Sequence, residues 1–575
     1  MITGAAAHAG GRHDAAAAAF GELARRQPRE ACHWLNLGTS LRALGRYDEA
    51  LRAYAQAHAL GGETAAFCYN VGLTHLDRFD FESARAVLGR GVALAPRDAL
   101  MRLQYAKACF ESGETDAGVE ALADSAALET LPATAAAEAG QRLQAAGEAA
   151  LAARMMDRLA ADPDLDPEAG LTLVQMLERV NRVEEAQALL ARLRAAPHPA
   201  ALAAGIAAAQ GRIAQRAGRH DEAIVQLREA VAAPDGAPPR HHELFPLAHS
   251  LAATGRTAEC WQTLEAAHRA QLAQLRLSAP LLVAHGAPDL AIAQRGVSRD
   301  DVAAWDDGSA DGPDEASDPV FIVAFPRSGT TLLEQALDAH PALASMDEQP
   351  FLHHALTELA TVEGARYPDA LAAVDRGTLA AIRGRYFERV RRRIPLAPGQ
   401  RLLDKNPLNL LRLPAIRRLF PRARILLAVR HPCDVLLSCY MQHFTAPGFA
   451  LLCADLPTLA AGYRRAFDAW HRDQAVLQAA VREVRYETLV GDFERELRGI
   501  AAFLDLPWHD AMLAPAAHAR AKPFISTPSY AQVVQPVSAR AVGRWRAYRR
   551  HFEPVLPVLA PLLERWGYDT GAAAG

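Results

Sequence analysis

A period of 34 residues runs through the first half of this 575-residue chain and limits its fold more than any other feature. The stretch LNLGTSLRALGRYDEALRAYAQAHAL (35–60) aligns with YNVGLTHLDRFDFESARAVLGRGVAL (69–94). Such a period predicts stacked copies of one small helical unit, because a single unit cannot bury its apolar face alone. The turn position recurs every 34 residues, at Gly11, Gly45, Phe79, Gly113, Gly147 and Asn181.

Small residues follow these turns at a fixed distance, which indicates closely packed helix pairs. Alanine stands five residues after most turns, and two further copies of the unit place Gly218 and Gly255 at steps of 37. This pattern resembles the tetratricopeptide repeat, which implies an α-solenoid over residues 1–294. A generic alanine-rich bundle would not keep one period through six turns. The groove of such an array takes a peptide or partner protein, or the array serves only for docking or dimerisation.

Bulk properties narrow the class of protein. The net charge of −4 argues against general nucleic-acid binding. The seven scattered cysteines form no CxxC pair, which is typical of free thiols in a reducing compartment. There is no long apolar run, and the first residues lack a basic leader before an apolar core. We therefore expect a soluble, cytoplasmic protein without a membrane span.

A change of composition marks the end of the repeats. The stretch RGVSRDDVAAWDDGSADGPDEASD (295–318) is rich in Asp, Gly and Ser, which predicts a solvated linker. The β-like run PVFIVAF then begins a second domain at 319–570, and its buried character predicts a parallel α/β sheet.

The turn after this first strand has the layout of an anion-binding loop. The sequence PRSGTT leads directly into the helical pattern LLEQALDAH, so a helix start at Thr330 or Thr331 would offer free backbone N–H groups. The alternative is an ordinary turn with capping hydroxyls. The loop lacks the GxxxxGK[ST] of nucleotide hydrolases, which disfavours a kinase. Its candidate anion-binding residues are Arg327, Ser328, Gly329, Thr330 and Thr331.

Three later strand-like runs also end in polar residues. RARILLAVRHPCDVLLSCY predicts a strand over 424–429, then Arg430, with Ser438 two helical turns further on. RLLDKNPLN places Lys405 at the end of another strand, and VREVRYETLV ends a third at Tyr486 and Glu487.

Taken in order, these motifs resemble the sulfotransferase family that uses 3′-phosphoadenosine-5′-phosphosulfate (PAPS), and within it the tyrosylprotein sulfotransferase branch. The resemblance covers about residues 318–550. It implies that PRSGTT holds the 5′-phosphosulfate and that Arg430 and Ser438 hold the 3′-phosphate.

The resemblance also assigns catalytic roles. Glu348, in MDEQPF, matches the general base, and Asp347 is the neighbouring alternative. Lys405 matches the lysine that steadies the bridging oxygen, and Arg327 would neutralise the phosphosulfate. The segment SYAQVVQPVSARAVGRW resembles the loop around the nucleotide; Tyr486 would lie nearby, and the loop would open at Ser529 and close at Arg544.

The match departs from the secretory-pathway enzymes at several places. Gln442 stands where they have an arginine, Arg544 where they have a lysine, and Met346 and Leu403 where they have cysteines. Their acceptor-reading arginines are missing from QPFLHH, where Phe351 and Leu352 suit either an apolar acceptor or the core. His353 and His354 point about 100° apart on a helix and make a poor metal pair, and no metal is required.

The sequence therefore predicts transfer of a sulfuryl group from PAPS to an acceptor hydroxyl. A protein or peptide tyrosine, presented by the repeats, is the first choice of acceptor. A glycan or small-molecule hydroxyl is the alternative, and a catalytically inactive nucleotide-binding scaffold is a further one. A homodimer is also compatible with the repeat array.

Overall fold

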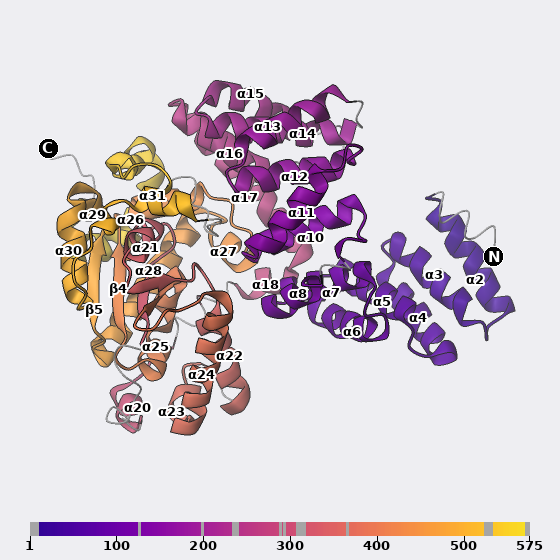
Figure 1. Ribbon diagram of the computed structural model, residues 1–575, viewed down its shortest axis with the longest axis horizontal. Helices are drawn as coiled ribbons and strands as arrows, with labels where there is room; N and C mark the ends of the chain where they lie inside the picture. The colour runs from indigo at the N-terminus through magenta and orange to yellow at the C-terminus, as the bar shows by residue number, and fades with distance from the viewer. Residues whose placement is uncertain are drawn as a thin grey trace. The chain divides into compact units, whose positions relative to one another are not determined.

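Two compact units make up the chain, Met1–Ala209 and Gln210–Gly575. The structure is a computed structural model, drawn in Figure 1. It describes residues 11–124, 128–196, 200–232, 241–286, 290, 295–305, 318–363, 367–522 and 533–569. Each unit is considered by itself below.

The first unit consists of consecutive antiparallel helix pairs (Figure 1). The bounds of its helices are α2 His13–Arg26, α3 Ala31–Ala43, α4 Tyr47–Gly61, α5 Ala65–Asp77, α6 Phe81–Leu94, α7 Ala99–Glu111, α8 Thr115–Leu122, α10 Ala133–Ala145, α11 Ala149–Ala160, α12 Pro167–Arg179 and α13 Val183–Ala195. Helix α14, Ala200–Arg216, crosses into the second unit.

The predicted turns are confirmed by their backbone conformation. All six turn positions of the 34-residue period, and also Gly218 and Gly255, have φ between 59° and 84°. This left-handed conformation ends one helix and lets the next fold back along it. Phe79 and Asn181 adopt it without being glycine.

Small residues are buried where the helices of a pair meet. Ala16, Ala50, Ala84 and Ala186 are all 0% exposed. At Gly38, a Cβ atom would lie 2.4 Å from the Tyr54 ring, so only glycine fits against that side chain. The 34-residue period thus preserves the sites of closest helix approach.

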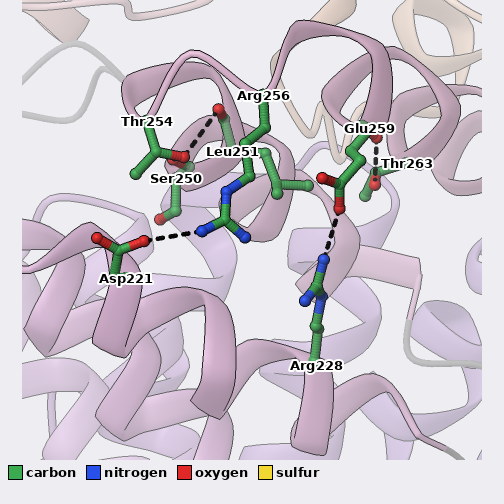
Figure 2. Close-up of polar contacts among 8 residues, drawn as sticks. All are labelled: Asp221, Arg228, Ser250, Leu251, Thr254, Arg256, Glu259 and Thr263. Carbon is green, nitrogen blue, oxygen red and sulfur yellow. Dashed lines mark hydrogen bonds and ion pairs between the residues drawn. The ribbon is translucent and has the colours of Figure 1, made fainter.

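Repeat-type helices continue into the second unit as α15 His220–Val231, α16 His241–Ala253 and α17 Thr257–Ser278. Figure 2 shows how they are joined at the surface. Arg228 of α15 pairs with Glu259 of α17 at 2.6 Å, and Arg256 pairs with Asp221 at 3.0 Å. Within helices, the Thr254 and Thr263 hydroxyls donate to backbone carbonyls one turn earlier.

A five-stranded parallel sheet forms the centre of the second unit, with strand order β2-β3-β1-β4-β5. In register, Val320 of β1 lies between Leu403 of β3 and Arg424 of β4. The strands are β1 Val320–Val323, β2 Leu343–Ser345, β3 Arg401–Lys405, β4 Arg424–Val429 and β5 Val481–Arg485.

The central strands β3, β1 and β4 are buried on both faces, as their apolar sequences predict. Val320 and Ile322 face a core with α21 and α30, and α30 runs beside β5 in Figure 1. Phe321 and Val323 face the larger core. The remaining helices are α18 Pro280–His285, α20 Arg299–Ala304, α21 Thr330–Asp338, α22 Phe351–Glu363, α23 Ala370–Ala373, α24 Arg376–Arg393, α25 Leu413–Leu419, α26 Pro432–Tyr440, α27 Pro447–Leu452, α28 Leu456–Leu477, α29 Tyr486–Gly491, α30 Phe493–Phe503, α31 Pro515–Ala521, α33 Arg549–Phe552 and α34 Leu556–Arg565.

The larger core also contains residues of α15–α17. Leu227, Phe245 and Leu264 belong to the same apolar cluster as Phe321 and Phe325. The contacts between residues therefore divide the chain at Ala209–Gln210. The predicted linker at 295–318 instead marks the place where the composition of the sequence changes. Its middle, 306–317, lies outside the described residues, and α20 forms near its start. Helical repeats followed by a parallel α/β domain are thus confirmed.

Candidate functional site

Because all five strands are parallel, their carboxyl ends meet at one edge of the sheet, where ligands of such folds usually bind. A cavity of about 540 Å³ opens there. The predicted site residues that line it are Arg327, Gly329, Thr330, Thr331, Glu348, Arg430, Ser438, Tyr486 and Arg544. The structure therefore brings together residues that span more than two hundred positions of the sequence.

The loop after β1 has a strained backbone that turns it around the cavity. Arg327 has φ 71° and Gly329 has φ 90°, both in the left-handed region. A Cβ atom on Gly329 would lie 2.4 Å from the Tyr486 ring, so the loop and Tyr486 are in closest contact. The Ser328 hydroxyl donates to the Phe325 carbonyl at 2.7 Å, and thus secures the loop instead of lining the cavity.

Arg430 is held from several sides, and one of its three nitrogens has no partner in the described part of the chain. Its Nη1 donates to the Arg327 carbonyl at 3.2 Å, its Nη2 donates to the Ala541 carbonyl, and its guanidinium lies 4.8 Å from the centre of the Tyr486 ring. The buried Nε has no hydrogen-bond partner among the described residues. An anion in the cavity would satisfy this donor.

Positive charge dominates this part of the cavity. Arg327 Nε donates to Ser438 Oγ at 3.1 Å, and burial together with the Arg430 and Arg544 charges lowers the pKa of Arg327. The neighbouring carboxylates are engaged elsewhere: Asp434 accepts from the Gly543 and Trp545 amides, and Glu487 accepts from the His431 amide. The residues present fit a phosphate or phosphosulfate group, because they supply cationic and hydroxyl donors and a helix N-terminus at Thr330.

Two carboxylates flank Lys405 at the end of β3. Its Nζ lies 2.7 Å from Glu348 and 3.2 Å from Glu334, and both Lys405 and Glu334 are 0% exposed. Burial alone would lower the pKa of Lys405, but the carboxylates outweigh it and raise the pKa above its usual value. Burial raises the pKa of Glu334 to about 7, although Lys405 opposes this. Ser345 Oγ donates to the other oxygen of Glu334 at 2.5 Å.

Glu348 reaches the cavity and is about one-third exposed, whereas Lys405 lies behind it. A carboxylate open to the cavity can take a proton from a bound hydroxyl. The ammonium beside it can stabilise negative charge that develops on an oxygen nearby. The arrangement therefore suits transfer of a group between two oxygens.

Other residues singled out from the sequence lie away from the cavity, differ in secondary structure from the prediction, or fall outside the described residues. Phe351 and Leu352 are buried in the main core. Gln442 donates to the His443 carbonyl at 3.3 Å. Tyr486 begins helix α29 instead of ending β5, which stops at Arg485. Ser529 lies outside the described residues.

Sequence reasoning missed several residues of the site. Glu334 is hidden in the helical pattern LLEQAL, and nothing in that pattern sets it apart from a solvent-facing residue. Arg540 lines the cavity four residues before Arg544, inside the segment already expected to surround the nucleotide. Phe444 and Phe449 form an apolar wall, with ring centres 4.5 Å apart.

Two broader observations concern the described residues only. His, Cys, Asp and Glu side chains there form no cluster of three that could hold a metal ion. Across the same ranges, every helix is too short or too polar to span a membrane.

Fold and site together define an α/β domain with a parallel sheet and an arginine-lined cavity at the carboxyl ends of its strands. Comparison with known proteins specifies it: the sulfotransferase family matches residues 319–510, and a tetratricopeptide repeat matches 34–58. The chain carries a sulfotransferase family domain behind N-terminal tetratricopeptide repeats.

Relatives are distant. Protein-tyrosine sulfotransferase 1 of Danio rerio is 28% identical over 269 residues, 44% of this chain and 73% of that protein. An uncharacterized protein of Aquifex aeolicus is 28% identical over 251 residues, which are 42% of this chain and only 32% of its own length. The sulfotransferase domain of the Synechococcus PCC 7002 olefin synthase is 25% identical, with a TM-score of 0.32, over 44% of this chain and 96% of that one.

Proposed function

We propose that the second unit transfers the sulfuryl group of PAPS to the phenolic hydroxyl of a tyrosine in a protein or peptide. The observation that supports this most is the pairing of Glu348 with Lys405 beside a cavity that is lined by four arginines. This combination provides a base, a buried cation and an anion site at one edge of the sheet. A purely nucleotide-binding scaffold would not need the first two.

Two groups of residues in the cavity would hold the two charged ends of the donor. Arg327, the 329–331 backbone and the two threonine hydroxyls hold the 5′-phosphosulfate at the start of α21. Arg430, with its unpartnered Nε, and Ser438 hold the 3′-phosphate. Arg540 and Arg544 lie near the end of the segment that would surround the adenosine.

In the reaction, the acceptor oxygen forms a bond to sulfur while the bond from sulfur to the bridging phosphate oxygen breaks. Glu348 takes the phenolic proton, and the electron pair of the broken bond stays on the phosphate. Lys405 and Arg327 stabilise that charge. Positioning and preorganised charge account for most of the catalysis in such transfers.

The named relatives and the lining of the cavity both support tyrosine as the acceptor. Relatives named protein-tyrosine sulfotransferase favour tyrosine, and the apolar wall of Phe444 and Phe449 suits an aromatic ring. The repeats of the first unit would recruit the polypeptide that contains it. A glycan hydroxyl is the second candidate, because the arginines that would read acidic flanking residues are missing.

Incubation with ³⁵S-labelled PAPS tests the proposal. A set of tyrosine peptides with acidic and with neutral flanks, their phenylalanine counterparts and a set of sugars would serve as acceptors. Labelling of the tyrosine peptides only, lost in Glu348→Ala, is expected. Labelling of sugars alone would move the acceptor to the glycan class, and no labelling of any acceptor would contradict transferase activity.

A further inference from the structure

A repeat-type helix packs against the segment that forms one wall of the cavity. Helix α17 turns one stripe of side chains, Trp261, Leu264, His268 and Gln271, toward the interior of the second unit. Their spacings of three, four and three residues place them on one face of the helix. All four are at least 90% buried, although α17 continues the pattern of surface repeats.

Two of these side chains bond to the backbone of the segment Tyr440–Phe449, which follows the Ser438 helix. His268 Nε2 donates to the Tyr440 carbonyl at 2.8 Å, and Gln271 Nε2 donates to the Phe444 carbonyl at 2.8 Å. The first bond is buried and the second is partly buried, so losing either donor leaves a poorly solvated carbonyl without this partner, which is costly.

Ring contacts hold the same segment. Tyr440 stacks on Trp261 at 5.1 Å and on His268 at 4.3 Å. From α16, the Phe245 ring lies 5.2 Å from His443. Burial, with the charges of Arg544 and Arg327, lowers the pKa of His249, also on α16, to about 4.

What this segment supplies to the cavity is its apolar wall. Phe444 and Phe449 line the cavity and pack edge to face at 4.5 Å, and the Phe449 ring lies 5.8 Å from that of Phe325, two residues after β1. Among the other apolar residues of the lining, Val533, Pro536, Val537 and Ala541 lie on the segment expected to close over the nucleotide. Pro326 and Leu332 lie on the loop and helix expected to hold the phosphosulfate. Phe444, Phe449 and Leu408, three residues after Lys405, are therefore left for the acceptor.

We propose that His268 and Gln271 of α17 are positioning residues for the acceptor: they fix the 440–449 segment so that Phe444 and Phe449 hold the acceptor's aromatic ring. This inference rests on the proposed function for its substrate. Under this proposal, the last repeat helices help to position the acceptor, in addition to any role in recruiting a partner.

The test uses the full chain and the variants Gln271→Leu and His268→Phe. The second keeps the stacking on Tyr440 and loses only the donor. Gln215→Leu is the matched control, because Gln215 makes the same kind of bond, to the Pro246 carbonyl at 2.7 Å, within the repeat helices of this unit. N-acetyltyrosine amide is the acceptor, and 3′-phosphoadenosine-5′-phosphate is the nucleotide probe.

For Gln271→Leu and His268→Phe we expect an acceptor KM raised about ten-fold, equivalent to about 1.4 kcal/mol. We expect kcat and nucleotide affinity to change less than two-fold, and amide hydrogen exchange over 440–449 to become faster. The control should show none of these effects. Unchanged KM and exchange, or a parallel fall in nucleotide affinity, would overturn the inference.

Failure of the proposed function would look different. A wild-type protein that binds the nucleotide but sulfates no tyrosine would refute the acceptor chemistry. The exchange measurement would then still decide whether α17 positions the segment, since it requires no turnover.

Discussion

Replacing Lys405 by methionine is expected to destabilise the second unit by an amount that increases with pH. The substitution keeps the length of the side chain and removes the positive charge that Glu334 faces at 3.2 Å. Glu348, the other partner, is partly exposed and can turn to solvent. Glu334 is 0% exposed and cannot, so the change leaves a buried carboxylate without its counter-charge.

The pH dependence follows from the pKa of Glu334. Its folded value of about 7 exceeds its ordinary value of 4.5, so between these values the unfolded chain ionises while the folded one stays protonated. Stability therefore falls as pH rises through this range. Because Lys405 lowers the pKa of Glu334, its removal raises that value further and extends the loss above pH 7.

The free energy of unfolding is expected to fall by about 1.4 kcal/mol for each pH unit over which Glu334 is protonated in the folded chain and ionised in the unfolded chain. Removing one partner of a buried pair costs about 3–5 kcal/mol in total. The difference between wild type and Lys405→Met should approach this value at pH 9 and shrink to the packing contribution at pH 5. Burial also raises the pKa of Asp404 to about 7, and Lys405 opposes this as well, so Asp404 adds a smaller contribution of the same sign to the difference.

Urea unfolding followed by tryptophan fluorescence measures the effect. Trp34 is the single tryptophan of the first unit, so the signal reports mainly on the second. The double variant Lys405→Met/Glu334→Gln is the control, and it should lose the pH-dependent destabilisation that comes from Glu334. An equal loss at pH 5 and pH 9, or a double variant as unstable as the single one at pH 9, would refute the reasoning.

Three further predictions concern the cavity. Arg430→Ala should weaken binding of 3′-phosphoadenosine-5′-phosphate about 100-fold in calorimetry, because it removes a charged donor fixed by two backbone carbonyls. Glu348→Gln should lower kcat about 10²–10⁴-fold and leave nucleotide affinity within two-fold, because it removes only the base. Gly329→Ala should weaken nucleotide binding at least about ten-fold and lower the melting temperature, because its Cβ would overlap Tyr486 at a φ of 90°.

Each of these has a matched control. Arg495→Ala removes an exposed arginine and should leave nucleotide binding unchanged. Asp347→Asn should reduce kcat much less than Glu348→Gln, and the reverse order would make Asp347 the base. Gly399 has φ 82° and open space around it, so Gly399→Ala separates backbone strain from overlap with a neighbour. If Gly399→Ala weakened nucleotide binding as much as Gly329→Ala, the contact with Tyr486 would not be responsible.

Local patterns sufficed for much of the architecture. The 34-residue period located the left-handed turns, and strand ends located Lys405 and Arg430, because parallel strands bring their carboxyl ends to one edge. These are properties of short sequence windows and of sheet geometry.

Tertiary contacts decided the rest. Glu334 occupies a position that looks solvent-facing in its helix, and only its packing against β3 makes it a buried partner of Lys405. Residues of α16 and α17 share a core with the sheet. The sequence repeat does not predict this, because repeat helices with a solvent-facing side have the same spacing. Phe444 and Phe449 lie in a stretch without any recognisable motif.

The most direct test of the central claim is calorimetric titration of the full chain with 3′-phosphoadenosine-5′-phosphate, with adenosine triphosphate in parallel. The site described here predicts micromolar binding of the bisphosphate, abolished by Arg430→Ala, and weaker binding of the triphosphate. Absence of binding, or preference for the triphosphate, would contradict assignment of the cavity to a phosphosulfate donor.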